Sequence, residues 1–198
     1  KLITVGIVLL LLCLGASAQP EIKIALKAGA KAEQDTKAQL ERLLKKYDLS
    51  KWIFTKSILI DAKEIPHSHP ILTLSTRHLL DDDLLLATFV HEQLHWFVIQ
   101  DQKVLGSVVD DLKKKFPSIP TAPGEGAQDE ESTYLHLAVC YLEYRATREL
   151  LGELRAKQIM DFWATDHYKW IYRTVRDQPR DIGDIMFKYK LVPGVKRT

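Results

Sequence analysis

Apolar and polar residues follow two different periods along this chain, and the change from one to the other predicts its fold class. Three early segments, residues 21–27, 56–61 and 70–76, are typical of β-strands, the first by a clear alternation of polar and apolar residues. Later segments carry apolar residues at helical spacing. Strands that cluster early and helices that cluster late indicate an α+β domain. We expect a small N-terminal antiparallel or mixed sheet followed by a mainly helical part.

The helical segments start and stop at recognisable signals. Residues 33–47 carry leucines at helical spacing with charges between them, which predicts an amphipathic surface helix. Three aspartates at 81–83 suit the N-terminal dipole of a helix that continues through the apolar run 84–99. A second long helix is expected at 130–151, ended by Gly152. Shorter helices are expected at 104–116, 153–163, 166–176 and 182–189, and loops at 66–70 and 117–126.

The first 18 residues are typical of a secretory signal peptide. A positive start precedes a short aliphatic run, and small residues lead to an expected cleavage point after Ala18. The alternative is an uncleaved N-terminal anchor. With cleavage, residues 19–198 form a single domain with no second long apolar segment, so we expect a secreted or periplasmic protein that does not associate with a membrane.

The composition of the chain argues against one class of partner and against stabilisation by a disulfide. The formal net charge of the chain is only +2, so no nucleic-acid partner is implied. After residue 18 the sequence holds one cysteine, Cys140, which excludes an internal disulfide in the mature chain. We expect Cys140 to be a small buried residue, although a thiolate there could also ligate a metal.

The most specific chemistry lies in the apolar run, which contains His91-Glu92-Gln93-Leu94-His95. Residues four apart on a helix lie on the same face, so both imidazoles can reach one ion. Glu92 is then close enough to contact a water on that ion. This is the H-E-x-x-H arrangement of two zinc ligands and a general base. In a purely structural helix these three ionisable groups would be buried at a cost of several kcal/mol without partners.

A catalytic zinc takes three protein ligands, so the third must come from elsewhere in the chain. The helix expected at 130–151 places His136, Cys140, Glu143 and Thr147 along one face. On ligand chemistry we favour Glu143 as the ligand, with His136 as a partner either of a ligand or of the transition state. The reverse assignment gives a site of three histidines and stays open.

His91, Glu92 and His95, followed by a glutamate on a later helix, resemble the gluzincins. These are zinc peptidases of the zincin type. Gluzincins often carry E-x-x-x-D on the later helix, whereas Thr147 stands four residues after Glu143. The resemblance implies a zincin-like domain with the motif on a buried active-site helix, and a strand before that helix, here residues 71–76, that pairs with extended substrate.

The resemblance also implies a His or Tyr from a later segment as donor to the developing oxyanion, and the candidates are His167, Tyr168 and Tyr172. Other polar groups have simpler expected roles. His67 and His69 flank a proline-rich loop and are expected to be solvated rather than to bind a metal. Arg145 and Arg148 are expected to pair with neighbouring acids.

These features together predict a secreted zinc metallopeptidase that acts on peptides or proteins. His91, His95 and a third ligand would hold zinc, and Glu92 would take the proton of the attacking water and pass it to the leaving amine. Two alternatives remain: a zincin-like protein that binds without hydrolysis, and a metal-dependent hydrolase of non-peptide substrates.

Overall fold

A computed structural model describes residues 22–120 and 122–196, so the expected signal peptide lies outside the described residues. The strands are β1 (Lys23–Leu26), β2 (Ser57–Ile60) and β3 (Leu72–Leu74). The helices are α1 (Lys31–Lys46), the short 3-10 helix η1 (Ser50–Trp52), α2 (Asp82–Val98), α3 (Gln102–Lys115), α4 (Glu130–Leu151), α5 (Glu153–Asp166), α6 (Lys169–Asp177) and α7 (Pro179–Lys188). The α+β class and each predicted helix are confirmed.

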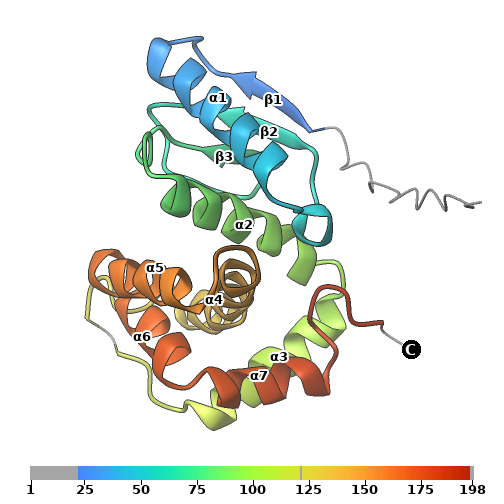
Figure 1. Cartoon of the computed structure of the whole chain (residues 1–198). Coiled ribbons are helices and arrows are strands. Elements are labelled where there is room, and N and C mark those ends of the chain that lie inside the picture. The colour runs from blue at the N-terminus through green and yellow to red at the C-terminus, as the bar shows by residue number, and fades with distance from the viewer. Residues whose placement is uncertain (1–21, 121, 197–198) are drawn as a thin grey trace, which may run out of the picture.

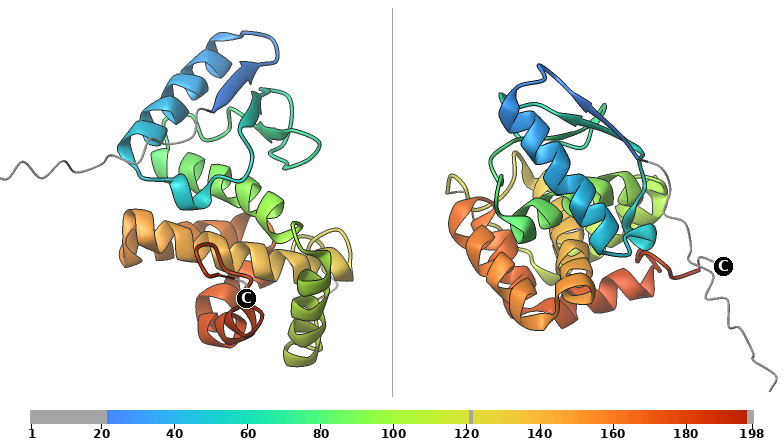
Figure 2. Two further views of the ribbon diagram at one scale, coloured as in Figure 1. Left: turned by 90° about the vertical axis from the view of Figure 1, so that its right-hand side faces the viewer. Right: turned by 45° about the horizontal axis from the view of Figure 1, so that its top comes forward.

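Helix α2 divides the molecule into two halves (Figure 1). The sheet and α1 lie on one side of α2, and helices α4 to α7 lie on the other, an arrangement that the two further views also show (Figure 2). Helix α2 packs against β3 and α1 above and against α4 and α5 below. None of the helices in the described part of the chain is long and apolar enough to span a bilayer.

The sheet differs from the expected antiparallel or mixed arrangement. Its order is β1-β2-β3, and both strand pairs are parallel, with Ile24 opposite Ile58 and Ile60 opposite Leu74. For β1 and β2 the direction follows from their connection, because α1 returns the chain to the same end of the sheet before β2 begins. The antiparallel contact recorded in the described part is an isolated bridge between His67 and Thr73.

Helix α2 is buried on nearly all sides, which explains why its sequence is mostly apolar outside the motif. The side chain of Asp81 caps its start by accepting a hydrogen bond from the Leu84 amide at 3.0 Å. Leu94 of the motif belongs to the core and is fully buried. A helix buried on both sides has no solvent to satisfy its polar side chains, so each of them needs a partner inside the protein.

Gln93 shows how one such partner is supplied. Its carbonyl oxygen accepts hydrogen bonds from the backbone amides of Phe54 and Thr55, at 2.7 and 2.8 Å, and its amide donates to the Thr55 carbonyl at 2.9 Å. These bonds join the middle of α2 to the segment between η1 and β2. Gln93 therefore fixes the rotation of the helix that carries the motif histidines.

The helical half closes around α4. Asp129 caps the first turn of α4, and the helix ends at Gly152, whose φ of 87° favours glycine. Arg155 of α5 makes a bidentate ion pair with Asp83 of α2, with one bond of 2.6 Å to Asp83 Oδ2. The C-terminal helix α7 packs against α3 and α4.

Three smaller expectations about α4 meet different outcomes. Cys140 is fully buried, as expected for a small core residue. Arg148 pairs with Glu153 at 2.6 Å, which confirms its expected role. Arg145 was expected to pair with an acid. Its guanidinium instead lies over the ring of Phe187, and its buried Nε has no hydrogen-bond partner.

Replacing Gln93 by methionine keeps the volume of the side chain and removes all three of its backbone bonds. We expect Gln93→Met to lower the free energy of unfolding by about 2–4 kcal/mol, since two buried amides and a carbonyl lose their partner. Urea denaturation without added metal measures the change. The matched control is the exposed Gln100→Met, and equal stability of the two variants would contradict the anchoring role.

Candidate metal centre and its cavity

The motif residues line a cavity of about 750 Å³ that both halves of the molecule enclose. The sheet half contributes the segment from Ala62 to Ser68 and the residues that follow β3. The helical half contributes His136 and the junction between α5 and α6. The motif and the later helix that were expected to form one site therefore meet in one place.

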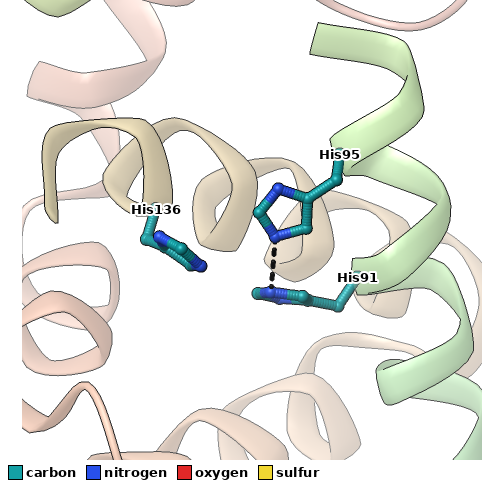
Figure 3. A group of neighbouring side chains, drawn as sticks. All are labelled: His91, His95 and His136. Atoms are coloured by element: carbon teal, nitrogen blue, oxygen red, sulfur yellow. Dashed lines mark hydrogen bonds between the residues drawn. The ribbon is translucent and has the colours of Figure 1, made fainter. Parts of the chain in front are cut away.

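Two motif histidines point their rings at each other from successive turns of α2 (Figure 3). The Nε2 atoms of His91 and His95 lie 3.2 Å apart. Tetrahedral nitrogen ligands at roughly 2.0–2.1 Å from a zinc ion lie about 3.3–3.4 Å from one another. The two imidazoles thus already have the separation that a shared ion requires.

His136 approaches this pair from α4 (Figure 3). Its ring centroid lies 4.9 Å from that of His95 and 5.8 Å from that of His91. Its Nδ1 donates to the Ser132 carbonyl at 2.7 Å, which leaves Nε2 with a free lone pair. Ligand atoms of the three histidines all lie within 4.8 Å of one another, so the triad is compatible with a metal ion.

Glu143 lies on the other side of His91. Its Oε2 accepts a hydrogen bond from His91 Nδ1 at 2.9 Å and from the Tyr172 hydroxyl at 3.0 Å. Its Oε1 is buried without a hydrogen-bond partner. Together with Cys140 and His91 it forms a second group that could hold a metal ion. His91 thus belongs to both groups.

Burial controls the ionisation of these groups. It raises the pKa of Glu92, whose side chain is only 6% exposed, to about 7, although the nearby His91 acts in the opposite direction. Burial, together with the neighbouring imidazoles, lowers the pKa of His95 well below its usual value and that of His136 to about 4. His91 is the exception. Burial lowers its pKa, but its contacts with Cys140 and Glu143 raise it further, to well above the usual value.

The downstream candidates occupy different positions. The ring of Tyr168 lies 4.5 Å from that of His136, and its left-handed backbone, with φ of 48°, turns the chain from α5 into α6. His167 lines the cavity and donates from Nδ1 to Asp166 at 2.7 Å. Tyr172 is buried and its hydroxyl is already bonded to Glu143. Tyr168 and His167 are therefore better placed than Tyr172 to contact a substrate.

The wall on the sheet side restricts the expected pairing of an extended substrate with residues 71–76. The backbone of His67 pairs with both the amide and the carbonyl of Thr73, so the outer edge of β3 is already occupied there. Trp96 holds the same segment, because its indole donates to the Ser68 carbonyl at 2.8 Å and its ring stacks on His69. Neither His67 nor His69 belongs to a group that could hold a metal within the described residues.

Two cavity residues escaped the sequence reasoning. Arg77, in the segment after β3, makes a bidentate ion pair with Asp166 at the end of α5. Asp166 also accepts the hydrogen bond of His167. No local pattern marks Arg77, whereas Asp166 stands directly before a candidate residue and could have been singled out.

Comparisons of the chain with protein-family models, with curated proteins and with solved structures find no match. The candidate metal centre is therefore supported by the geometry of its residues alone.

Because His91 belongs to both candidate groups, substituting it tests the metal site whichever group holds the ion. We expect zinc at about one hundred times its Kd to raise the Tm of the wild type by roughly 5–10 °C, and His91→Ala to abolish this rise. Differential scanning calorimetry with and without zinc measures it.

The matched control is His78→Ala, since His78 is a buried histidine of the same cavity outside both groups. A rise that persists in His91→Ala would place the ion elsewhere. No rise in the wild type would argue against both groups.

Proposed function

We propose that this protein is a zinc-dependent peptidase that uses Glu92 as general base. One observation carries the proposal: a buried carboxylate and three converging imidazoles from two helices share one cavity large enough for a peptide segment. A helix with only a structural role gains nothing from placing these groups together.

The proposed ligands are His91, His95 and His136. The Nε2 atoms of the first two already face each other, and the Ser132 carbonyl fixes the third in the tautomer that leaves Nε2 free. Glu143 then acts as the acceptor that orients His91, a role that carboxylates commonly have behind ligating histidines. Ligand chemistry alone favours Glu143 as the third ligand. The present assignment instead makes His136 the ligand and Glu143 the residue that supports a ligand. The orphaned Oε1 of Glu143 is the feature that favours the second group.

A zinc ion, when bound, would lower the pKa of a water ligand and polarise the scissile carbonyl. Glu92 would take the proton from the attacking water, since its carboxylate lines the same cavity as the three histidines. It would then deliver this proton to the leaving amine. The low exposure of Glu92 keeps competing water away from the carboxylate.

Tyr168 is the proposed donor to the developing oxyanion, and His167 is a proposed substrate contact beside it. Burial raises the pKa of the Tyr168 hydroxyl, so it stays protonated and can donate a hydrogen bond. The bond from Nδ1 to Asp166 leaves Nε2 of His167 with a lone pair, so this nitrogen can accept a hydrogen bond from an N–H group of a substrate in the cavity. Both residues come from one junction, between α5 and α6.

We further propose a peptide or protein substrate and a secreted or periplasmic location, the latter from the pattern of residues 1–18. Binding without hydrolysis, and hydrolysis of non-peptide substrates, are the rival outcomes. The presence of a buried general-base carboxylate beside the histidines favours hydrolysis.

Three substitutions on α4 distinguish the donor sets. We expect His136→Ala to lose stoichiometric zinc, Cys140→Ala to keep it, and Glu143→Gln to weaken affinity by about 10- to 100-fold. Elemental analysis after dialysis against a zinc buffer measures occupancy. Loss of zinc in Cys140→Ala with retention in His136→Ala would assign the ion to the second group instead.

Glu92→Gln tests the chemistry separately from the metal. We expect it to retain one zinc per chain and to lose peptide hydrolysis by at least about a thousandfold, because glutamine cannot accept a proton. Cleavage of a peptide library, read by mass spectrometry, measures turnover. Glu64→Gln is the control, as Glu64 lines the same cavity but is exposed. Full activity in Glu92→Gln would refute the assigned role.

A further inference from the structure

An ion pair crosses from one wall of the cavity to the other. Arg77 comes from the segment after β3, in the sheet half, and Asp166 ends α5, in the helical half. Both line the cavity. Arg77 is the one lysine or arginine among the residues recorded as lining it, so this pair places the main cationic side chain of the cavity against a single carboxylate.

The Arg77–Asp166 ion pair is also hydrogen-bonded to His167, which is a candidate substrate contact. One guanidinium nitrogen of Arg77 donates to Asp166 Oδ2 at 3.0 Å, and the other bonds to Oδ1. The same Oδ2 accepts the Nδ1 proton of His167 at 2.7 Å. Asp166 therefore stands between Arg77 and His167, and the position of its carboxylate is set from the opposite wall.

Asp166 alone would be a poorly fixed partner for His167. It is the last residue of α5, where a helix frays, and the chain turns directly afterwards through the left-handed Tyr168. A bidentate guanidinium fixes a carboxylate in both position and plane, which a single hydrogen bond does not. The bond from Arg77 also holds the pKa of Asp166 at about 2, so the carboxylate remains an acceptor at neutral pH.

Within the part of the chain that the structure describes, the bond to Asp166 is the one hydrogen bond of the His167 ring. Its other neighbours are aromatic: the rings of Trp163, Tyr168 and Tyr172 lie 5.2, 4.8 and 5.7 Å from it. Aromatic contacts confine an imidazole but do not choose its tautomer, whereas a hydrogen bond to Nδ1 does. The tautomer with the proton on Nδ1, and hence a free Nε2, depends on Asp166.

We propose that Arg77 is a positioning residue: it holds Asp166 across the cavity so that His167 presents Nε2 to the substrate. This inference rests on the proposed peptidase function for its catalytic consequence. The link from Arg77 through Asp166 to His167 does not depend on turnover, so it can be measured separately.

The chain supplies a matched control for this proposal. Arg155 and Asp83 also form a bidentate pair, which ties α5 to α2, and the two aspartates are similarly exposed, 25% for Asp83 and 23% for Asp166. The control pair does not line the cavity and no histidine bonds to Asp83 in the described contacts. If ion pairs on α5 matter only for stability, both should behave alike.

The first measurement is the tautomer of His167 by ¹⁵N–¹H NMR of the full chain labelled at histidine, with His167→Gln to assign its signals. We expect the wild type and Arg155→Ala to show the Nδ1–H tautomer, and Arg77→Ala to show an exchange-averaged mixture. Arg77→Lys, which keeps the charge but not the bidentate geometry, should lie between. An unchanged Nδ1–H tautomer in Arg77→Ala would overturn the proposal.

The second measurement is peptide hydrolysis by the zinc-loaded variants. We expect Arg77→Ala to lower kcat by about 10- to 100-fold with KM changed by less than about twofold, while Arg155→Ala keeps its kcat. Equal loss in both variants would overturn the positioning role and leave a stability effect. If the wild type hydrolyses no peptide, the peptidase function fails, and the NMR comparison still decides the role of Arg77.

Discussion

The burial of α2 on both sides is the constraint on which the rest of the structure depends. A helix enclosed by a sheet and by other helices must satisfy its polar side chains within the protein. Gln93 takes its partners from the backbone before β2, Trp96 from the Ser68 carbonyl, and His91 from Glu143. The groups left facing the cavity are Glu92 and the two Nε2 atoms. The chemistry of the site consists of the groups on this helix that the core does not satisfy.

Helix α4 serves this arrangement in two ways at once. His136 and Glu143 are two turns apart on the same face, so one helix places a carboxylate at Nδ1 of His91 and a third imidazole near the ring. Tyr172 then supports Glu143 from α6. A single packing interface between α2 and α4 thereby determines which atom of His91 is free, and a small rotation of α4 would disturb the ring from both sides.

The local sequence pattern was sufficient to predict where the helices and strands lie and to find the H-E-x-x-H motif. Caps such as Asp81, the stop at Gly152 and the apolar spacing of the helices act within a few residues, and they are read directly from the sequence. Parallel pairing was missed because it depends on where α1 returns the chain. The choice between His136 and Glu143 could not be made from spacing, since both lie on one face and only the rotation of α4 against α2 separates them. Arg77 gave no signal, because its partner is distant in sequence.

The anchoring of the segment from Ala62 to Ser68 has a mechanical consequence. The Ala62 amide is bonded to the buried Glu33 carboxylate, His67 is paired with Thr73, and Ser68 is held by Trp96 on the motif helix itself. These bonds therefore couple the wall to α1, to β3 and to the helix that carries His91 and His95. Any widening of the cavity for a bulky ligand would then require the junction between α5 and α6 to move away, and the Arg77–Asp166 ion pair that crosses the cavity to break.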